Sequence, residues 1–244
     1  MDYLSTKLNL VKAGCVVGNF IFNHICYADD MVLFAPSYKG LQMLVNICQS
    51  VGLELNIIFN ERKSKCMTFY HKSYPQNNIN ISLNANIIEN VDNVVYLGVI
   101  LNNRLDDNEE IKRQYRGICA RGNTLCRKFN YCIDEIKNEL FNIYCTSSYG
   151  MSLICKFNKK VFKKFNVCYN NCFRFLHGLP RWCSASEMFA VNNVMSFQAS
   201  LRKKQYILLK MIDNSVNELV LKTSSYGMRN TDLHRFLEKS LFLT

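Results

Sequence analysis

The sequence lacks the segments that mark a membrane-spanning or secreted protein. No apolar run reaches the roughly 18 residues that a membrane helix needs, because charged or amide side chains interrupt every stretch. The first residues, MDYLSTKLNLVKAG, show neither a basic start followed by an apolar block nor a small-residue cleavage site, as a signal peptide would. We therefore expect an intracellular protein without a membrane partner, in the nucleus or the cytoplasm.

Proline and glycine are also scarce, at 3 and 10 of 244 residues. This scarcity excludes a collagen or a Pro-rich linker, and an apolar content of 49% excludes a disordered chain. The length allows one large domain or two small ones with a real core. The twelve cysteines form no CxxC pair and lie mostly among apolar neighbours, so we expect reduced thiols.

Positive charge is concentrated in one part of the chain. Residues 112–181 contain 14 of the 30 Lys and Arg residues but only three acids, whereas the rest of the chain is balanced. A basic surface of this size favours a polyanionic partner, most simply nucleic acid. A solvated helical face is the alternative.

Local patterns predict a mixed region up to about residue 103. Residues 19–35 read as a hairpin of two apolar runs, with Asp29 and Asp30 at its tip. Ser37 is a predicted N-cap, and the helix that follows is predicted to end at Gly52. Residues 71–93 read as an Asn-rich loop with a small hairpin, and residues 93–101 as a strand.

The pattern becomes helical from about residue 104. Acidic residues occupy the start of a first helix, where negative charge is favoured. Its apolar residues recur at steps of three and four up to residue 129. Further helices are predicted over 134–150, 157–176, 186–192 and 197–213. Gly178 and Pro180 are predicted to end the helix over 157–176. We therefore expect an α+β fold.

Two adjacent acids at the tip of a hairpin are electrostatically unfavourable unless a cation lies between them. Asp29 and Asp30 therefore suit Mg²⁺, which takes one or two carboxylates together with the phosphate oxygens of a substrate. An ordinary polar turn is the alternative for these two residues.

Four segments in order carry a resemblance to a known family. They are Tyr27-Ala28-Asp29-Asp30 between apolar strands, Asn60-Glu61-Arg62-Lys63-Ser64-Lys65, Val95-Tyr96-Leu97-Gly98, and the helical stretch 169–187 with Gly178-Leu179-Pro180-Arg181. Together they resemble the reverse transcriptases (RNA-directed DNA polymerases) of LINE-type non-LTR retrotransposons. The resemblance covers about residues 10–210.

The resemblance implies a right-hand polymerase fold of which this chain holds part. Residues 1–103 would be a partial palm with the hairpin, 104–183 a basic helical thumb, and 184–244 a C-terminal helical segment. The implied activity is RNA-templated DNA synthesis by two-metal nucleotidyl transfer. The implied partners are an RNA template, a DNA primer and a deoxynucleotide, and the implied cofactor is Mg²⁺, with Mn²⁺ as a substitute.

The resemblance also assigns roles to single residues. Asp29 and Asp30 would hold the metal, Tyr27 would lie near the primer end, and Lys63 near the departing pyrophosphate. Tyr96, Leu97 and Gly98 would position the primer strand. The basic residues expected to bind phosphates of the duplex are Lys112, Arg113, Arg116, Lys159, Lys160, Lys163 and Lys164. A solvated turn lysine is the alternative for Lys63, and a plain core strand for residues 96–98.

One departure from the family weighs against activity. The family needs a further metal-binding aspartate on an earlier strand, and the only acid before Tyr27 is Asp2. We therefore expect a truncated fragment that is inactive alone, with deoxynucleotide binding only if the missing palm and fingers are supplied. A non-catalytic nucleic-acid-binding remnant of a retroelement is the alternative function.

Aromatic and cysteine residues in the basic region are expected to have structural roles and not to bind bases or a metal ion. We expect Tyr115, Phe129 and Tyr169 in the core rather than stacked on bases, and Trp182 as a core anchor. The spacing of residues 168, 172, 177 and 183 allows a zinc site, but it is irregular, and we do not expect one.

Overall fold

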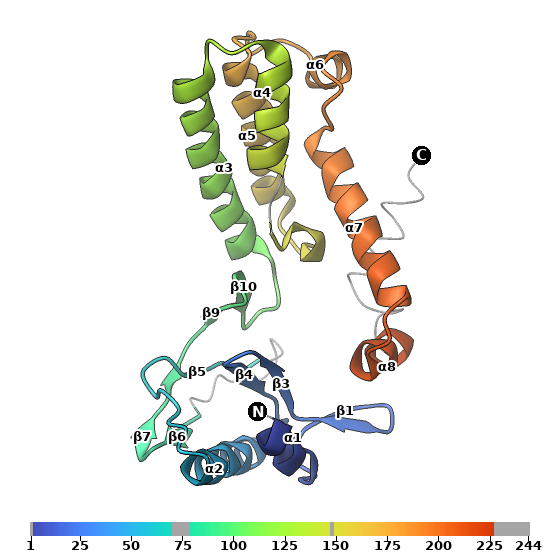
Figure 1. Ribbon diagram of the computed structural model, residues 1–244. Helices are drawn as coiled ribbons and strands as arrows, with labels where there is room; N and C mark the ends of the chain where they lie inside the picture. The colour runs from blue at the N-terminus through green and yellow to red at the C-terminus, as the bar shows by residue number, and fades with distance from the viewer. Residues whose placement is uncertain (1, 70–78, 147–148, 227–244) are drawn as a thin grey trace. The chain divides into compact units, whose positions relative to one another are not determined.

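The computed structural model describes residues 2–69, 79–146 and 149–226 and combines helices with short strands (Figure 1). This mixture confirms the α+β class. The chain divides into two compact units. The described part of unit 1 runs up to Val94 and includes the residues from Asn217 onward, and unit 2 runs from Val95 to Val216. The domain limits predicted at residues 103 and 183 stay predictions.

Unit 1 consists of paired short strands and three helices within the described residues. The elements are α1 (Asp2–Asn9), β1 (Cys15–Val17), β2 (Phe20–Phe22), β3 (His24–Tyr27), β4 (Asp30–Leu33), α2 (Tyr38–Glu54), β5 (Lys65–Cys66), β6 (Ser82–Leu83), β7 (Asn86–Ile87), β8 (Glu89–Asn90) and α8 (Glu218–Tyr226). The pairs β1–β2, β3–β4 and β6–β7 are antiparallel, and β5–β8 is parallel.

The first apolar run of residues 19–35 is not one strand, contrary to our prediction. It breaks at Asn23, so that β2 pairs with β1 while β3 pairs with β4. The Asn23 side chain is 3% exposed, and its Nδ2 donates to the carbonyls of Leu8 (2.8 Å) and Ala13 (3.0 Å). These long-range bonds satisfy a buried amide, and they explain why the chain turns there.

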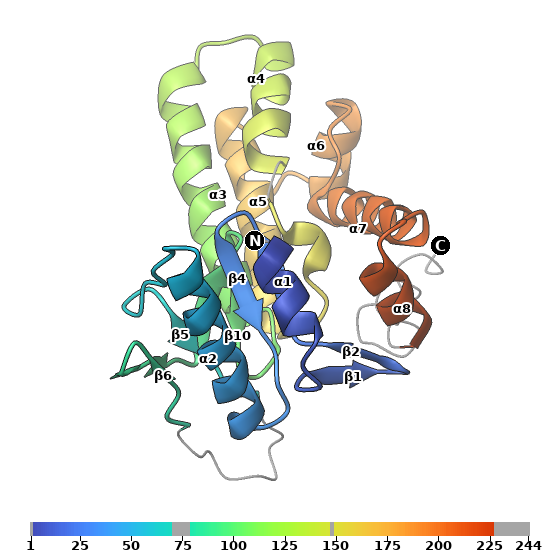
Figure 2. The same cartoon turned by 60° about the horizontal axis from the view of Figure 1, so that its bottom comes forward.

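Helix α2 begins where the sequence predicts. The Ser37 hydroxyl accepts a hydrogen bond from the amide of Gly40 at 3.2 Å, as an N-cap does. The helix packs against α1 and β4 (Figure 2), and Leu44 and Cys48 join Leu8 of α1 in one buried cluster. A core between these elements supports the β3–β4 hairpin from one side.

Gly52 does not end α2, which continues to Glu54. A Cβ at this position would lie 2.7 Å from the carbonyl oxygen of Ile57. The glycine therefore permits a close return of the chain after the helix. Its role is packing rather than helix termination.

Unit 2 is mostly helical. Its elements are β9 (Asn93–Tyr96, which starts at the boundary), β10 (Val99–Asn102), α3 (Asn108–Phe129), α4 (Asp134–Phe141), a π-helical turn Asn142–Thr146, a 3₁₀ turn Met151–Leu153, α5 (Lys159–Leu176), α6 (Ala185–Val191) and α7 (Phe197–Asp213). The predicted ranges 186–192 and 197–213 are confirmed for α6 and α7 to within one residue.

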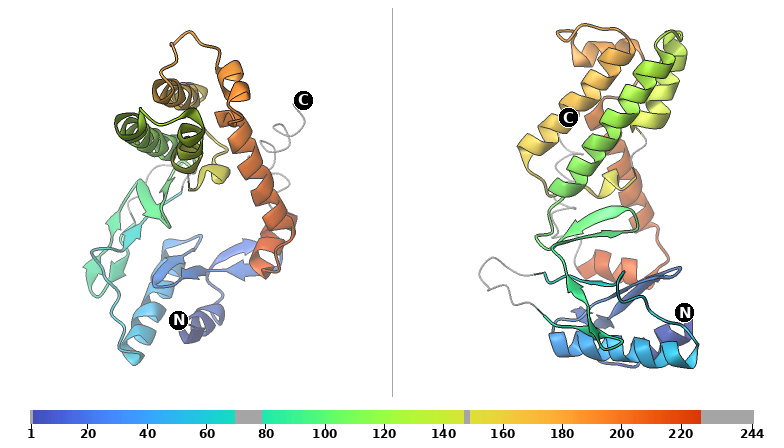
Figure 3. Two further views of the ribbon diagram at one scale, coloured as in Figure 1. Left: turned by 45° about the horizontal axis from the view of Figure 1, so that its top comes forward. Right: turned by 90° about the vertical axis from the view of Figure 1, so that its left-hand side faces the viewer.

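Helices α3 and α5 lie side by side and run in the same direction (Figure 3). Their starts are joined by the Asn108 side chain, whose Oδ1 accepts from the amide of Asn158 at 2.8 Å. Further along, a Cβ at Gly122 would lie 2.6 Å from the Cys172 sulfur. The bare glycine therefore lets the two helices approach closely.

The main core of unit 2 is built from aromatic rings. Phe141 of α4 meets Tyr169 and Phe173 of α5 edge to face, with both centroid distances at 5.0 Å, a favourable arrangement. Phe165 packs in the same way on Phe197 of α7 at 4.6 Å. These contacts hold α5, which carries a cluster of lysines, against α4 and α7.

Three sequence predictions for unit 2 need correction. The helix predicted over 134–150 is α-helical only to Phe141, after which it widens into the π-helical turn; residues 147 and 148 lie outside the described residues. Residues 93–101 form a hairpin of β9 and β10 instead of one strand. Trp182 is 87% exposed and is no core anchor.

Two other expectations for this unit are confirmed. Gly178 follows α5 with φ 65°, the left-handed conformation of a helix C-terminus. Tyr169 is 1% exposed, and its hydroxyl donates to the carbonyl of Met195 at 3.0 Å. Among the helices of the described residues, none is both long and apolar enough to cross a membrane.

Candidate functional site

The acid pair lies on the tight turn between β3 and β4. Tyr27 pairs with Asp30 across the hairpin, so Ala28 and Asp29 form a two-residue turn. Ala28 has φ 53°, a conformation that is uncommon for residues other than glycine. Such strain occurs at functional turns, and here it places two carboxylates next to each other at the hairpin end.

Both carboxylates face solvent. Asp29 and Asp30 are exposed, and Tyr27 is 63% exposed. The ion pairs within the described residues include neither aspartate. Two adjacent, unneutralised acids are therefore available to a cation.

The donor set at this turn suits part of a magnesium site. Carboxylate oxygens are the ligands that Mg²⁺ prefers, and one or two of them suffice when phosphates and water complete the shell. No group of three His, Cys, Asp or Glu side chains gathers in the part of the chain that the structure describes. Asp29 and Asp30 thus fit one incomplete cation site and do not make up a two-ion site.

Asn60 organises the turn that carries Lys63. Its side-chain oxygen accepts from the amides of Arg62 (3.1 Å) and Lys63 (3.2 Å), and its carbonyl accepts from the amide of Ser64 (3.0 Å). This Asx turn gives a physical reason for an asparagine three residues before the lysine. Lys63 is exposed, and no described ion pair or hydrogen bond joins its side chain to Asp29 or Asp30.

The segment Tyr96-Leu97-Gly98 forms the tip of the β9–β10 hairpin. Leu97 and Gly98 have φ values of 46° and 75°, so both turn residues are left-handed. A two-residue hairpin turn of this kind matches the twist of its strands. The sequence signal Leu-Gly therefore marks a turn, and Tyr96 and Val99 flank it.

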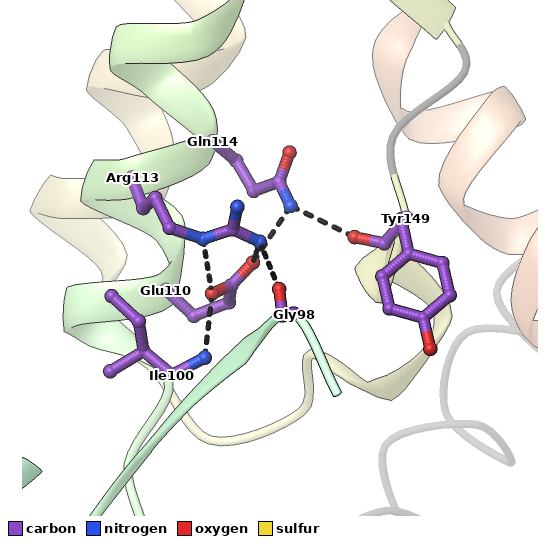
Figure 4. A network of polar contacts seen from close by, with 6 residues as sticks. All are labelled: Gly98, Ile100, Glu110, Arg113, Gln114 and Tyr149. Atoms are coloured by element: carbon purple, nitrogen blue, oxygen red, sulfur yellow. Dashed lines mark hydrogen bonds and ion pairs between the residues drawn. The ribbon is translucent and has the colours of Figure 1, made fainter. Parts of the chain in front are cut away.

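A network of polar contacts ties this hairpin to α3 (Figure 4). Arg113 donates from Nη2 to the carbonyl of Gly98 at 2.8 Å, and from Nη2 and Nε to the two oxygens of Glu110 at 2.6 and 2.8 Å. Glu110 Oε2 also accepts from the amide of Ile100 at 3.0 Å. Gln114 bridges Glu110 (2.7 Å) and the carbonyl of Tyr149 (2.8 Å).

Glu110 is the centre of this network and is 2% exposed. Burial by itself raises the pKa of a carboxyl group. The hydrogen bonds from Arg113, Ile100 and Gln114 outweigh burial and lower the pKa of Glu110 below its ordinary value. The same contact raises the pKa of Arg113. Both groups are therefore charged at neutral pH, and the hairpin is fixed to α3 by a buried carboxylate.

The sequence did not indicate this role for Glu110 or Arg113. The sequence indicates only that acids at the start of α3 favour its dipole and that Arg113 binds phosphate, whereas the Arg113 guanidinium holds the hairpin. Lys112 is also paired, with Glu109 at 2.6 Å on the surface. The available signal was the spacing of Glu110 and Arg113, which allows an i,i+3 ion pair. The phosphate-binding roles of Lys112 and Arg113 stay predictions.

The other predicted basic residues are exposed. Arg116 lies on α3, and the four lysines predicted on α5 occupy its first two turns; they are Lys159, Lys160, Lys163 and Lys164. Helix α5 contains no acid, and the ion pairs of the described residues involve none of these four lysines. The positive charge of α5 is therefore not neutralised by neighbouring acids.

A hollow between α3 and α5, which the sequence did not predict, adjoins these lysines. It has a volume of about 640 Å³. Its lining residues come from α3 and from successive turns of α5; they are Tyr115, Cys119, Asn123, Lys160, Lys163, Lys164, Val167, Cys168, Asn171, Cys172 and Phe175. Tyr115 is 38% exposed, contrary to our expectation of a core residue, because it faces this hollow.

The residues considered for zinc have separate surroundings. Cys168 and Cys172 line the hollow, and the Cys168 sulfur lies 3.2 Å from that of Cys119. His177 stacks on Phe173 at 4.4 Å and contacts Asp134 through Nδ1 at 3.1 Å. Cys183 donates to the carbonyl of Ser184. All twelve cysteines are free thiols.

Comparison with known proteins finds similarity over the segment that contains the acid turn. Residues 1–101 match the model described as reverse transcriptase (RNA-dependent DNA polymerase). Over 69 residues, 27% of this chain, the sequence is 39% identical to the retrovirus-related Pol polyprotein from type-2 retrotransposable element R2DM of Drosophila melanogaster.

The shared stretch is 6% of the length of that polyprotein, so the similarity concerns a small part of the relative. No solved structure matches the chain significantly. The strained acid turn, the Asn60 turn and the Leu97-Gly98 hairpin turn all lie within the residues that match the family model. Residues 1–101 of this chain are thus similar to a segment of a reverse transcriptase, and 69 residues of the chain are similar to part of a retrotransposable element's Pol polyprotein.

Proposed function

We propose that this chain is a part of a retrotransposon reverse transcriptase that contributes one carboxylate arm of the metal site and a basic surface for the template–primer duplex. The observation that carries the proposal is the Tyr27–Asp30 turn. It lies within the family match and presents two exposed carboxylates that no described ion pair neutralises. In this proposal unit 1 is part of the palm, and unit 2 contains the thumb.

The exposed residues of the turn and Lys63 would hold the metal ion and orient the groups that react. Asp29 and Asp30 would hold Mg²⁺, or Mn²⁺ in its place, which when bound stabilises negative charge on phosphate oxygens. Tyr27, which pairs with Asp30 across the hairpin, would lie against the primer end. Lys63, exposed on its Asn60-capped turn, would neutralise charge on the departing pyrophosphate.

The same geometry supports the proposal that the described residues do not catalyse polymerisation alone. A two-ion mechanism needs carboxylates from more than one element, and no third potential ligand joins Asp29 and Asp30 within them. The second candidate function is a non-catalytic nucleic-acid-binding remnant of a retroelement. The lack of a third potential ligand beside Asp29 and Asp30 among the described residues favours it too.

Unit 2 would bind the backbone of the duplex. The first two turns of α5 carry two pairs of adjacent lysines that are one helical turn apart, without acids among them. Lysines contact phosphates largely without regard to base sequence. The β9–β10 hairpin, fixed by Glu110 and Arg113, would position the primer strand through Tyr96, Leu97 and Gly98.

Binding of an RNA–DNA duplex tests this role of α5. Replacing Lys159, Lys160, Lys163 and Lys164 by Ala should weaken binding by about ten-fold or more at moderate salt, because four phosphate contacts are lost. Fluorescence anisotropy with a labelled duplex measures the affinity. A control variant with Lys7, Lys12, Lys39 and Lys203 replaced by Ala loses the same charge from exposed positions elsewhere and should bind within about three-fold of the parent chain.

Primer extension tests the proposed inactivity of the chain, which both candidate functions share. On a primed RNA template with Mg²⁺ or Mn²⁺, we expect no extension by the chain alone. Extension that disappears in Asp29→Asn would show that the chain is a complete catalyst and would overturn the proposal of inactivity. Failure of the lysine-dependent duplex binding would overturn the nucleic-acid role in both candidate functions.

A further inference from the structure

We propose that the hollow between α3 and α5 binds an unpaired base of a single-stranded nucleic acid, with the adjoining phosphates held by Lys160, Lys163 and Lys164. The inference rests on the proposed function, because both place nucleic acid on unit 2. It adds a binding site for a base to a surface that otherwise recognises only phosphates.

The size and position of the hollow suit a small planar group. Its volume of about 640 Å³ lies within the roughly 300–1,000 Å³ typical of small-molecule sites. Its walls belong to two helices that are held in close contact at Gly122. The hollow is therefore formed by the packing of rigid elements and does not depend on a loop.

The walls of the hollow are apolar and aromatic although they face solvent. Tyr115 from α3 is 38% exposed, and Val167 and Phe175 from α5 are 47% and 51% exposed. Exposed apolar surface gathered in a concave site marks a binding site. Aromatic rings stack on bases without strong sequence preference.

Lysines line one end of the hollow, and acids are absent from its lining residues. Lys160, Lys163 and Lys164 lie on the turns of α5 that precede Val167. The two acids on α3, Glu109 and Glu110, are each paired with a basic residue on the same helix. The ligand must therefore combine a negatively charged part with a flat apolar part.

A nucleotide in a single strand combines these two parts, whereas a duplex keeps its bases stacked inside and offers mainly phosphates to such a surface. Two amides complete the site. Asn123 and Asn171 line the hollow, and Asn171 accepts from Arg174 at 3.1 Å through its oxygen, a contact that does not use its NH₂ group. An amide of this kind can bond the edge of a base.

Filling the hollow tests the inference. Val167→Trp places a large side chain among the lining residues and should weaken binding of a labelled, unstructured 12-nucleotide RNA by about ten-fold, in line with the loss of one stacked base. The same variant should bind a perfect RNA–DNA duplex as the parent chain does. Val191→Trp is the matched control, since Val191 is exposed on α6 and lies outside the hollow, and it should change neither affinity.

A spectroscopic measurement guards against loss of affinity through misfolding. The fluorescence of 2-aminopurine within the RNA should be quenched on binding to the parent chain, and Tyr115→Ala with Phe175→Ala should remove most of the quenching while the thermal melting curve is retained. A DNA strand of the same sequence shows whether the site distinguishes the two sugars, and quenching that depends on Tyr115 and Phe175 with either strand supports a base site.

Unchanged single-strand affinity and quenching in these variants would overturn the inference even if the duplex still binds through the lysines. Loss of duplex binding by Val167→Trp would equally contradict a site for an unpaired base. If the parent chain binds neither duplex nor single strand, the proposed function fails as well, so the two failures are distinguishable.

Discussion

Glu110 follows Glu109 in the sequence, but the two acids differ in their surroundings. Glu109 makes an exposed i,i+3 pair with Lys112, whereas Glu110 is buried and accepts from Arg113, Gln114 and the amide of Ile100. Surface pairs contribute about 0–1 kcal/mol, but breaking a buried pair leaves an uncompensated charge and costs about 3–5 kcal/mol. The burial of one side chain therefore decides which acid stabilises the fold.

We expect Glu110→Ala to reduce the free energy of unfolding by about 3 kcal/mol, because Arg113 and the Ile100 amide lose their partner. Glu109→Ala is the matched control and should cost less than about 1 kcal/mol. Urea unfolding followed by circular dichroism measures both values. Equal losses in the two variants would contradict the buried network.

The pH dependence of the same pair gives a second measurement. The pKa of Glu110 is lowered in the folded chain from its ordinary value of 4.5, so the unfolded chain binds the proton more readily. The contribution of Glu110 is present in full above pH 4.5 and is lost as the pH falls through the lower pKa. The stability difference between the parent chain and Glu110→Ala should therefore shrink in acid.

At the scale of elements, the pairing of α3 with α5 depends on one glycine. Gly117 and Gly122 lie on the same helix, but only Gly122 faces a neighbour at close range, the Cys172 sulfur. A Cβ at Gly117 would meet no heavy atom nearer than the flexible end of Arg121 at 3.3 Å. Glycine in a helix costs about 1 kcal/mol relative to alanine, and only at residue 122 does packing offset that cost.

We expect the two Gly→Ala substitutions to act in opposite directions. Gly117→Ala should stabilise the chain by about 0.5–1 kcal/mol through helix propensity. Gly122→Ala should destabilise it by about 1–2 kcal/mol, because overpacking between the helices exceeds the gain in propensity. Urea midpoints decide the signs, and stabilisation by both substitutions would contradict the close approach.

The hairpins show how local chemistry and distant contacts share control of an element. The turn at Leu97-Gly98 has glycine at a left-handed position, which its sequence indicates. The turn at Ala28-Asp29 has alanine at a left-handed position, which its sequence does not favour. The strands on each side of the second turn, and α2 behind them, compensate for that strain.

At the scale of the whole molecule, charge is separated by unit. The window of residues 112–181 lies within unit 2 and contains 14 basic residues against three acids, while the rest of the chain is balanced. Counterions released from a bound nucleic acid make affinity depend on salt according to the number of phosphates neutralised. The basic residues of this window therefore predict a measurable slope when the logarithm of the affinity is plotted against the logarithm of the salt concentration.

We expect the logarithm of the association constant for an RNA–DNA duplex to fall linearly with the logarithm of salt concentration. Replacing Lys159, Lys160, Lys163 and Lys164 should reduce the magnitude of the slope by about one for each lysine that contacts a phosphate. Anisotropy titrations across a series of salt concentrations give the slope. An affinity that is independent of salt would contradict a phosphate-binding role for unit 2.

Much of the fold was predictable where a signal is local. Ser37, Gly178 and the apolar period of α3 identify helices and their ends, because capping groups and one-face burial act within a few residues of the chain. The break at Asn23 was not predictable, since it depends on hydrogen bonds to Leu8 and Ala13. Gly52 was misread for the same reason, because its neighbour Ile57 returns through tertiary packing.

The candidate sites divide in the same way. The sequence by itself determined the adjacent acids on a turn, the order of the family motifs and the excess of lysine, because each is a property of consecutive residues. Only the tertiary structure decided that Glu110 is buried, that Arg113 holds the hairpin, and that Tyr115 and Phe175 face a hollow beside three lysines. Those outcomes depend on which segments α3 meets in the folded chain, the β9–β10 hairpin at one place and α5 at another, and burial of that kind is set by the whole packed unit.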